Sequence, residues 1–519
     1  MLSVDLDALT LDAVRQGALA GVPVTVLGLA RTGVGLARFL ADAGAVVTVY
    51  DGKPESALAE RLAELDGRPV RLLAGPEVDP ASAWAGAALV AFSPSITPGF
   101  PTTEPRLRAA LDSLAGRRRD GDAAAPALVS EPDLTLRLCP APTIGVTGTK
   151  GKTTTASLIA HLLSADPAHP VVLGGNIGVP LIDRVMELTP DHRVVVELSE
   201  LQLPSLTRGT TVAVYTNVTA DHLDRHGSLA AYRAVKRRLA ELVDPAGALV
   251  LNLDDPVVGG YAGLGTAPAV CYRLERPIPG GVGIVDGWVV VADVERLPLV
   301  GRGHAWTGPE GRIMPVAESS LPGRHNVSNL LAAVAVGLIF GLAPDAIRAA
   351  AATFEGVEHR LEPVGLVDGV RFVNDSQGTQ PDAVAAALRS FDAPLILIAG
   401  GRDKGVDLRA LAPVVAERAA AAVLIGESGP TLAALFRTAG CRRVEEAGTL
   451  EMAVPRADAI ARELLVGAVP GSVATVLLSP AAASFDQFPD YAARGRAFKV
   501  AVAGLAAAAR ESAGGDRRA

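Results

Sequence analysis

The chain has 519 residues, enough for about two to four domains that each bury a core of their own. Hydrophobic residues make up 49% and charged residues 20%, a composition that excludes an intrinsically disordered protein. The chain has 48 basic and 56 acidic side chains, so its net charge is −8. This charge excludes a general attraction to nucleic acid or to anionic membranes. Any phosphate group must therefore bind at a local site.

Cysteine usage and the first residues predict a cytoplasmic protein. The three cysteines are far apart and form no CxxC pair: Cys139, Cys271 and Cys441. This pattern favours reduced thiols over a disulfide framework or a zinc site. Asp5 and Asp7 stand where a signal peptide would carry positive charge. The longest apolar run, Leu330–Ala343, is too short to cross a bilayer and is predicted to be a core helix.

The first segment has the pattern of a nucleotide-binding βαβ unit. A buried strand, Val24–Leu27, precedes the glycine-rich stretch Gly28–Gly35, the helical pattern Leu36–Ala43 and a strand, Val46–Tyr50, that ends at Asp51. This order places the phosphates of a ligand at a helix N-terminus. Because the glycine spacing is not GxGxxG, the pattern favours a nucleotide-like ligand over a nicotinamide dinucleotide.

Two further features follow in this segment. The strand Ala88–Phe92 runs into the turn Ser93–Ile96, at a strand end where open α/β sheets bind ligands. The stretch Gly116–Ala127, which includes three consecutive arginines, is predicted to be a solvated loop near a domain boundary.

Strands and helices alternate through the rest of the chain. In the last segment the predicted strands are Arg371–Val373, Leu395–Ile398, Ala422–Ile425 and Ala474–Leu478, and an alanine-rich helical tail follows Phe498. We therefore predict an α/β protein of three domains with mostly parallel sheets. The predicted boundaries are a Rossmann-like domain at 1–140, a central P-loop ATPase-type domain at 141–357 and a Rossmann-like domain at 358–519.

The strongest local pattern is Thr143–Thr155, in which an apolar strand enters a glycine-rich turn and a helix begins near Lys152. Glycines allow backbone N–H groups to converge on a phosphate, Lys152 supplies a point charge, and the Thr153 hydroxyl can ligate Mg²⁺. Val146 stands where the GxxxxGK[ST] pattern requires its first glycine, so the sequence predicts a shortened P-loop.

Two more groups of polar residues follow predicted strands. Glu197 ends a buried β-branched strand, where the pattern favours a Mg²⁺ ligand over a buried salt bridge. Two histidines and two aspartates lie within six residues after the next strand, which favours a metal or phosphate site over ordinary loop histidines: Asp221, His222, Asp224 and His226. Lys236 follows on a predicted helix, Leu229–Leu242, and by itself would be expected to face solvent.

Together these residues resemble the Mur ligase superfamily, whose members are ATP-dependent and join amino acids to a peptidoglycan precursor. The matching stretches are Gly148–Thr154, Gly174–Gly178, Thr216–Asp224, Tyr232–Lys236, Gly323–Asn329 and His359–Arg360. Four others most resemble the branch that adds D-glutamate to UDP-N-acetylmuramoyl-L-alanine: Glu197–Leu203, Asn374–Ser376, Gly400–Gly405 and Leu478–Phe488 with Arg494-Gly495. The motifs occur in the family's order over roughly residues 22 to 503.

The resemblance implies an acyl phosphate formed from the substrate carboxylate and the ATP γ-phosphate, which the incoming amine attacks. The implied ATP-binding residues are Gly148, Thr149, Lys150, Gly151, Lys152, Thr153, Thr154, Asn326, Asn329, Arg360 and Asp375. The implied catalytic residues are Lys152, Glu197, His222 and Lys236, and the implied ligands of two Mg²⁺ ions are Thr153, Glu197, His222 and a carbamylated Lys236. The carbamate gives Lys236 a carboxylate where an ammonium would repel the metal.

The resemblance also implies where the other two substrates bind to a monomeric enzyme. The residues implied for the UDP-substrate are Arg31, Thr32, Asp51, Ser93, Asn176, Ser199 and Gln202. Those implied for D-glutamate are Thr379, Lys404, Ser484, Phe485 and Tyr491. The first domain would hold the UDP-substrate, the central domain ATP, and the last domain the amino acid while completing the ATP site.

Three positions depart from the family pattern. Gln377 stands where a lysine is usual, Ala482 where a cysteine is usual, and Glu200 where a small hydroxyl residue is common. Two alternatives therefore stay open, which are a sister or folylpolyglutamate-type ligase that uses another amino acid or carboxylate, and a non-catalytic nucleotide-binding relative.

Overall fold

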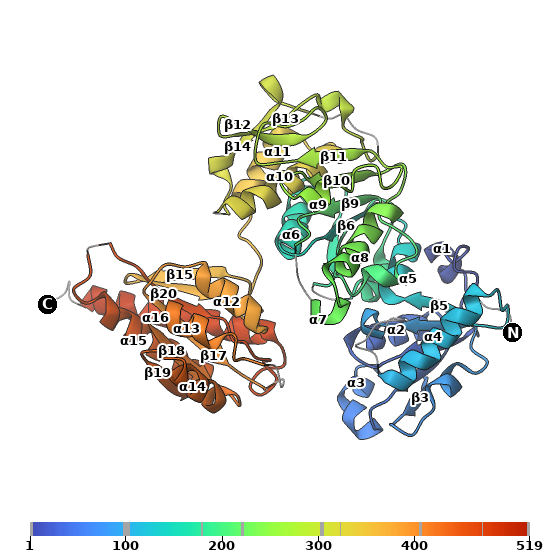
Figure 1. Ribbon diagram of the computed structural model, residues 1–519, viewed down its shortest axis with the longest axis horizontal. Helices are drawn as coiled ribbons and strands as arrows, with labels where there is room; N and C mark the ends of the chain where they lie inside the picture. Colours follow the sequence, from blue (N-terminus) through green and yellow to red (C-terminus); the bar gives the residue numbers. More distant parts are fainter. Residues whose placement is uncertain are drawn as a thin grey trace. The chain divides into compact units, whose positions relative to one another are not determined.

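In a computed structural model of the protein, the described residues are 4–96, 104–177, 180–219, 223–301, 306–321, 323–403, 407–469 and 471–515. The chain divides into two compact units, Met1–Phe354 and Glu355–Ala519. Figure 1 labels their helices and strands. Among the described residues, no helix is both long enough and apolar enough to cross a membrane.

The first unit begins with a five-stranded parallel sheet in the order β3-β2-β1-β4-β5. Its strands are β1 (Pro23–Leu27), β2 (Val46–Asp51), β3 (Val70–Ala74), β4 (Leu89–Phe92) and β5 (Ala127–Ser130). The helices of this region are α1 (Leu11–Arg15), α2 (Arg31–Asp42), α3 (Ala59–Ala63), α4 (Pro105–Arg119) and α5 (Glu131–Leu138). The predicted order of strand, glycine-rich turn, helix and strand is thus confirmed.

The prediction of a loop at Gly116–Ala127 is confirmed only for residues 120–126, which connect α4 to β5. Helix α4 continues through Arg119, and β5 begins at Ala127 as a member of the same sheet as β4. The three arginines lie in the last turn of α4, where positive charge interacts favourably with the helix dipole.

A nine-stranded sheet follows in the same unit, in the order β14-β13-β12-β11-β10-β9-β6-β8-β7. Its strands are β6 (Thr143–Thr147), β7 (Val171–Gly175), β8 (Arg193–Glu197), β9 (Val212–Tyr215), β10 (Ala248–Asn252), β11 (Ala269–Tyr272), β12 (Val282–Val285), β13 (Trp288–Val291) and β14 (Arg312–Pro315). The helices are α6 (Lys152–Leu163), α7 (Leu223–His226), α8 (Leu229–Leu242), α9 (Pro256–Gly259), α10 (Arg324–Ile339) and α11 (Pro344–Thr353). Only the pairs β12–β13 and β13–β14 are antiparallel.

The apolar run Leu330–Ala343 supplies most of α10, as expected for a core helix, but α10 ends at Ile339. Gly341, with φ at 77°, turns the chain toward α11. Helices α6, α10 and α11 pack against one another, and α6 and α10 cover one face of the central strands.

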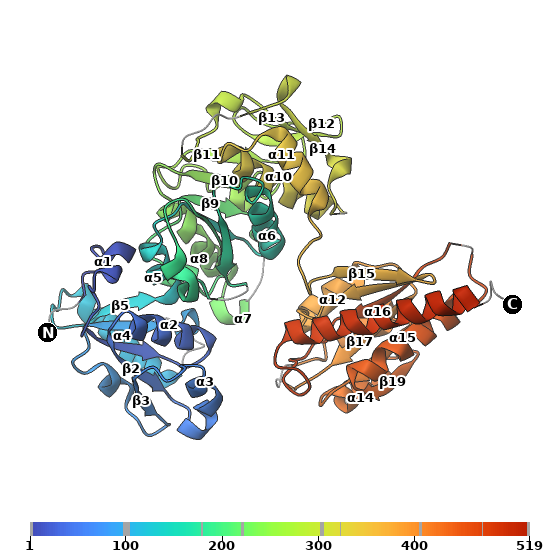
Figure 2. The same ribbon diagram turned by 180° about the vertical axis from the view of Figure 1, so that it is seen from behind.

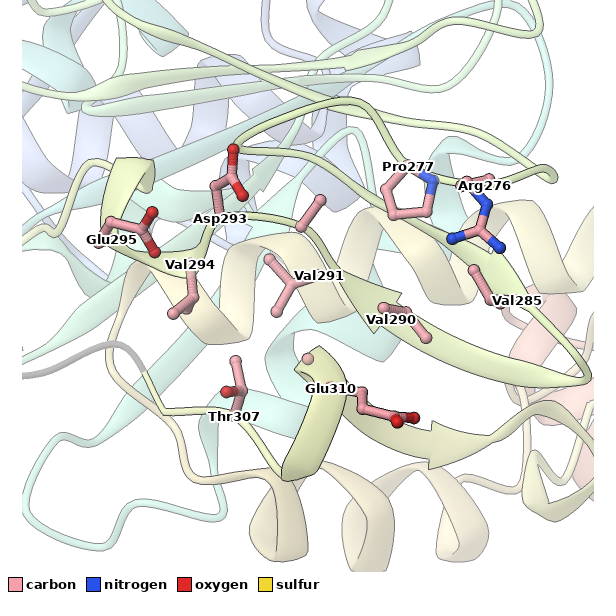
Figure 3. Close-up of a pocket in the computed structure, with 12 residues that line it drawn as sticks. Arg276, Pro277, Val285, Val290, Val291, Asp293, Val294, Glu295, Thr307 and Glu310 are labelled. Carbon is pink, nitrogen blue, oxygen red and sulfur yellow. The ribbon is translucent and has the colours of Figure 1, made fainter.

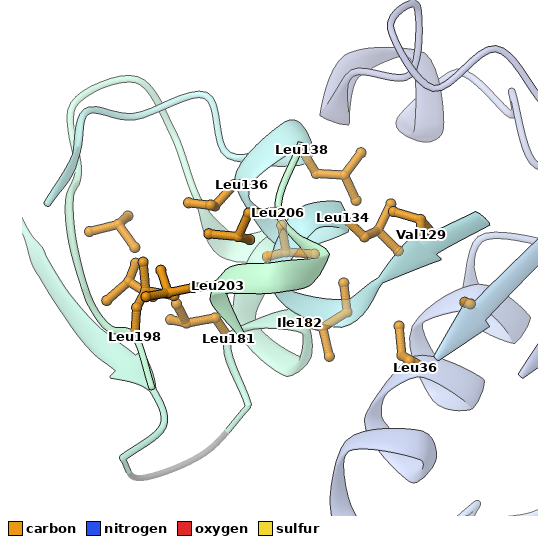
Figure 4. Packing of buried hydrophobic residues seen from close by; sticks show 14 of the residues in the cluster. Leu36, Val129, Leu134, Leu136, Leu138, Leu181, Ile182, Leu198, Leu203 and Leu206 are labelled. Carbon is orange, nitrogen blue, oxygen red and sulfur yellow. The ribbon is translucent and has the colours of Figure 1, made fainter. Parts of the chain in front are cut away.

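One hydrophobic cluster joins the two sheets of the first unit. Figure 4 shows Leu36 of α2 and Val129 of β5 on one side, and Leu198, Leu203 and Leu206 of the central region on the other. Leucines of α5 and the residues Leu181 and Ile182 belong to the same cluster. Burial of this continuous apolar surface explains why residues on both sheets form a single compact unit.

The second unit is a six-stranded sheet in the order β15-β16-β20-β17-β18-β19, in which only β15 runs antiparallel to its neighbour. Its strands are β15 (Glu362–Val367), β16 (Val370–Asn374), β17 (Leu395–Gly400), β18 (Ala421–Ile425), β19 (Val444–Gly448) and β20 (Ala474–Leu478). Its helices are α12 (Pro381–Arg389), α13 (Ala412–Arg418), α14 (Gly429–Thr438), α15 (Leu450–Leu465) and α16 (Tyr491–Gly515).

Helices α12, α13 and α14 form one layer on this sheet, and α15 and α16 form the other. Figure 2 shows α16 lying lengthwise beside α15. The predicted helical tail is confirmed, but the helix begins at Tyr491, before Phe498. The sequence prediction missed the edge strands β15 and β19, whose partly exposed residues lack the apolar runs of the central strands.

Candidate functional site

The glycine-rich turn follows β6, which is buried along its whole length, and α6 begins at Lys152 as predicted. Gly148 and Gly151 have φ angles of 150° and 83°, in the region that favours glycine. A Cβ on Gly148 would collide with the Thr216 hydroxyl, and one on Gly151 would lie 2.7 Å from Oδ1 of Asn329. The backbone therefore turns sharply enough to expose N–H groups at the start of α6.

The loop after β9, which neighbours β6 in the sheet, fixes this turn by backbone and side-chain hydrogen bonds. The Thr149 N–H donates to the carbonyl of Asn217 at 2.7 Å, and the Lys150 N–H donates to Oδ1 of Asn217 at 2.9 Å. Nδ2 of Asn217 and the hydroxyl of Thr216 both donate to the carbonyl of Lys150. The turn is therefore held without consuming the N–H groups at the start of α6. No role was predicted for Asn217, although it lies within the matched stretch Thr216–Asp224.

The side chains of the turn carry the charge and the hydroxyl that the sequence predicted. Nζ of Lys152 donates to the carbonyl of Thr149 at 2.8 Å, and Thr153 is buried in the first turn of α6. The neighbouring Thr154 is partly buried, and the Lys150 side chain is exposed. This combination can surround a polyphosphate with N–H donors and positive charge.

Glu197 ends β8 directly beside β6, where it pairs with Val146. Its side chain is buried, and Oε1 accepts a hydrogen bond from Nδ2 of Asn176 at 3.1 Å. Within the described part of the chain, Oε2 has no hydrogen-bond partner. A buried bare carboxylate oxygen is costly unless it meets a cation. This oxygen fits a metal ion.

Lys236 contradicts the expectation of a solvent-facing side chain, because it is fully buried. Its Nζ donates to the carbonyl of Gly148 at 2.9 Å and to Oγ1 of Thr147 at 3.3 Å, and lies 5.6 Å from the ring centre of Tyr232. The Tyr232 hydroxyl in turn lies 2.9 Å from Oγ1 of Thr149. Helix α8 therefore turns Lys236 toward the glycine-rich turn of residues 148–153, here called the phosphate turn.

The predicted histidines are only partly described. His222 lies outside the described residues, and the ring of His226 packs edge-on against Tyr232 at 5.3 Å. Within the described ranges, no three histidine, cysteine, aspartate or glutamate side chains are grouped to hold a metal ion.

At the carboxyl edge of the first sheet, Asp51 organises the turn after β1. Its Oδ2 accepts from the Leu29 N–H at 2.8 Å and its Oδ1 from the Lys53 N–H at 2.9 Å. Arg31 and Thr32 begin α2, whose N-terminus has no side-chain cap. Ser93 follows β4, with its hydroxyl 3.1 Å from that of Ser95. The structure thus gathers these four predicted residues on neighbouring loops of one sheet.

The other residues predicted for the UDP-substrate follow β7 and β8 of the central sheet. Asn176 is held by Glu197. Both the N–H and the hydroxyl of Ser199 donate to Oε1 of Gln202, at 2.8 and 2.9 Å. Residues 199–202, here called the substrate turn, are thereby fixed internally.

Asn326 and Asn329 lie on the first turns of α10. Nδ2 of Asn329 donates to Oδ1 of Asn326 at 3.2 Å, and Oδ1 of Asn329 accepts from the Thr155 hydroxyl at 3.1 Å. Because a Cβ on Gly151 would lie within 2.7 Å of Oδ1 of Asn329, the first turns of α10 lie close to the turn that precedes α6.

In the second unit, Asp375 follows β16 and is almost fully buried. Burial raises its pKa to about 6, although hydrogen bonds from the Ser479 hydroxyl, at 2.6 Å, and the Leu361 N–H oppose that shift. Gly378 leaves room for this arrangement, since a Cβ there would overlap both Asp375 and Ser479. Arg360 is exposed next to Leu361.

The residues predicted for the amino acid lie around the ends of β16 and β20. Ser484 is buried with no partner for its hydroxyl among the described residues, and Phe485 is 60% exposed. Tyr491 begins α16, and Thr379 lies just before α12. Lys404 lies outside the described residues.

Arg494 is a residue of this edge to which no role was predicted. Its guanidinium is buried and donates to the hydroxyl and carbonyl of Ser376 and to the carbonyls of Ala482 and Ala483. Burial lowers its pKa to about 10. One side chain of α16 thus joins the loops that follow β16 and β20. The matched pair Arg494-Gly495 was the only signal of it in the sequence.

A surface pocket of about 410 Å³ does not coincide with these residues. Figure 3 shows its lining, which comes from β12, β13 and the turns beside them and includes Arg276, Asp293 and Glu310. Three strands separate β12 from β6 in the sheet. None of the residues predicted to bind a substrate or a metal lines it.

Comparison with known proteins identifies both units. Residues 146–337 match the Mur ligase middle domain, and residues 359–482 match the Mur ligase, glutamate ligase domain. The UDP-N-acetylmuramoylalanine–D-glutamate ligase of Symbiobacterium thermophilum is 39% identical over 494 residues, covering 94% of this chain and 100% of that protein. The ligase of the same name from Geobacter metallireducens is 39% identical over 490 residues, 94% of this chain and 98% of that protein.

Among solved structures, MurF from Acinetobacter baumannii is similar with a TM-score of 0.53 and 15% identity. The match covers 96% of this chain and 98% of that one. At this identity the likeness supports the three-domain α/β fold alone.

Proposed function

Because this chain belongs to the Mur ligase family, at 39% identity to UDP-N-acetylmuramoylalanine–D-glutamate ligases, we propose a role in one reaction for each loop cluster described above. The protein is an ATP-dependent ligase of peptidoglycan precursor synthesis that joins D-glutamate to UDP-N-acetylmuramoyl-L-alanine. The observation that carries the assignment of roles is the phosphate turn of residues 148–153 beside the bare Oε2 of Glu197.

The reaction proceeds in two steps. The alanyl carboxylate attacks the γ-phosphate of ATP, so that ADP leaves and an acyl phosphate forms. The amine of D-glutamate then attacks the acyl carbon, inorganic phosphate leaves, and an amide bond remains. Both steps crowd negative charge, which fixed donors and cations at the phosphate turn stabilise.

The phosphate turn holds the ATP phosphates. Residues 148–154 surround them, with the N–H groups at the start of α6 and the Lys152 ammonium as donors, while the N–H groups of Thr149 and Lys150 are bonded to Asn217. Asn326 and Asn329 are assigned to the adenine and ribose, and Arg360 and Asp375 to the nucleotide phosphate and ribose.

Two magnesium ions belong to this site. Thr153 and Glu197 hold the first, which fits because Oε2 of Glu197 is buried and bare. His222 and a carbamylated Lys236 hold the second. When bound, the ions neutralise the phosphate and the transferred phosphoryl group. The buried Lys236 is oriented toward this region by the Gly148 carbonyl.

The other two substrates are assigned to separate groups of residues. Arg31, Thr32, Asp51 and Ser93 bind the UDP end, while Asn176, Ser199 and Gln202 position the sugar and alanine. Thr379, Lys404, Ser484, Phe485 and Tyr491 bind D-glutamate. In this proposal the domains span 1–140, 141–357 and 358–519, and the enzyme works as a cytoplasmic monomer.

Phosphate release tests the function directly. Purified enzyme with ATP, Mg²⁺ and UDP-N-acetylmuramoyl-L-alanine is offered D-glutamate, L-glutamate, D-aspartate or L-lysine. We expect release that requires both substrates and is fastest with D-glutamate. Release without the UDP-substrate, or a preference for lysine, would reject the assignment.

Lys404→Ala should chiefly raise the KM for glutamate.

The carbamate has its own test. Lys236→Ala should be nearly inactive, and short carboxylic acids or bicarbonate at millimolar concentration should restore part of the activity. Restoration by a primary amine instead would show that a positive charge is required at this position.

A further inference from the structure

The loops after β8 and β9 flank the phosphate turn, because β6 lies between these two strands in the sheet. The loop after β9 is fixed to the phosphate turn by the hydrogen bonds of Thr216 and Asn217. The loop after β8 is joined to β6 through Leu198, whose carbonyl accepts from the Thr147 hydroxyl at 2.8 Å. The substrate turn lies beyond that point.

An ion pair joins the two flanking loops directly. Oε1 of Glu200, in the substrate turn, lies 3.7 Å from Nη1 of Arg225 on α7. The side chain of Glu200 is only 7% exposed, and that of Arg225 is 36% exposed. Because the Glu200 carboxylate is so well shielded from water, loss of its charged partner costs more free energy than the same loss would cost an exposed carboxylate.

We propose that Glu200 and Arg225 form a strap between the substrate turn and α7 that holds the substrate turn in its binding position. The hydrogen bonds from Ser199 to Gln202 fix the shape of the substrate turn but not its place relative to the loop after β9. The ion pair supplies that second constraint. Glu200 is thus a positioning residue, and this inference rests on the proposed role of Ser199 and Gln202 in binding the UDP-substrate.

A small hydroxyl residue at position 200 could not form this pair, because its side chain is too short and uncharged. The strap is therefore a property of chains with a glutamate here. Pre-organisation of a binding turn raises affinity by reducing the ordering that the ligand must impose. Loss of the strap should weaken binding of the UDP-substrate and leave D-glutamate binding unaffected.

A double-mutant cycle tests the strap with wild type, Glu200→Gln, Arg225→Gln and the double variant. Titration calorimetry measures the Kd of UDP-N-acetylmuramoyl-L-alanine with Mg²⁺ and a non-hydrolysable ATP analogue present. Each single variant should raise this Kd about fivefold, and the double variant should be no weaker than either single one. In turnover assays the KM for D-glutamate should stay within twofold of the wild-type value.

The control is Asp166→Asn, which breaks the 2.8 Å pair with Arg193 at the opposite end of β8. It should leave the Kd of the UDP-substrate unchanged even if it lowers the melting temperature. Additive effects in the cycle, an equal loss in the control, or unchanged affinity in the single variants would overturn the strap. If wild type itself fails to bind the UDP-substrate, the proposed function fails, and the strap with it.

Discussion

The carboxyl edges of the nine-stranded and six-stranded sheets are both built to present loops, but they are organised by different means. At the nine-stranded sheet, the turn after β6 is held by short polar side chains of the adjacent loop, chiefly Thr216 and Asn217. At the six-stranded sheet, the loops after β16 and β20 are joined by the hydrogen bond from Ser479 to Asp375 and, most extensively, by the buried guanidinium of Arg494.

The two edges therefore differ in whether their charged side chain serves ligand binding or the stability of the fold. The phosphate turn has several small supports from the loop after β9, so its shape does not depend on the Lys152 side chain alone. Arg494 binds only protein oxygens, and its charge is buried, so its removal leaves the carbonyls of Ser376 and Ala482 without donors. We expect substitutions at the first edge to affect turnover and substitutions at the second to affect folding as well.

The largest effect is expected for Lys152→Ala. The loss of one charge that faces the phosphates should lower turnover at saturating ATP about a thousandfold, or about 4 kcal/mol of transition-state stabilisation. Circular dichroism and the melting temperature should match wild type, because the turn keeps its hydrogen bonds to Asn217. A variant that retains more than a tenth of wild-type turnover would refute the role of the phosphate turn.

Arg494→Met should instead destabilise the second unit. The buried carbonyls of Ser376 and Ala482 lose their donors, at a cost of about 3 kcal/mol, and the KM for D-glutamate should rise at least tenfold. Scanning calorimetry and steady-state kinetics measure both effects. The matched control is Arg496→Met, since Arg496 is exposed two residues along the same helix. Equal destabilisation by both variants would contradict the comparison.

Glu131 is the first residue of α5, and its carboxyl group is buried between α5 and the central region. Burial raises its pKa to about 7, against hydrogen bonds from the Ile182 N–H and the Thr135 hydroxyl. Because this folded-state pKa lies above the unfolded value, the folded state is favoured by protonation. The contribution of this protonation to the free energy of unfolding is full below about pH 4.5 and is lost as the pH rises through 7.

Glu131→Gln should therefore raise the free energy of unfolding by about 2–3 kcal/mol more at pH 8 than at pH 5. The reason is that the amide keeps an oxygen acceptor and carries no charge. Thermal melting of variant and wild type at the two pH values measures the difference. Glu60→Gln, at an exposed position of α3, should show no such pH dependence. A stabilisation that is equal at both pH values would exclude titration of Glu131 as the cause.

The smallest effect is expected for Gln377→Lys. Oε1 of Gln377 is buried without a hydrogen-bond partner among the described residues, so the amide contributes little there. A lysine should add one contact to the nucleotide phosphate and change turnover by about fivefold, or about 1 kcal/mol in the activation free energy. The preference among amino acids should stay as in wild type. Gln380→Asn, an uncharged change at the exposed residue before α12, is the control. A changed preference with Gln377→Lys would show that position 377 contacts the amino acid.

The sequence by itself determined the elements that depend on local pattern. Buried strands such as β6 and β20, the glycine-rich turn and the start of α6 at Lys152 follow from apolar runs and from backbone conformations that only glycine adopts. Family resemblance then supplied the reaction, because the motifs lie in order along nearly the whole chain.

Only the tertiary structure decided which side chains are buried and what they contact. The full burial of Lys236, the guanidinium network of Arg494 and the pair of Glu200 with Arg225 join residues from separate elements. The edge strands β15 and β19 were missed for a related reason, since half-exposed strands are recognised by their neighbours in the sheet more than by their own residues. Burial and pairing are set by long-range packing, which no local periodicity records.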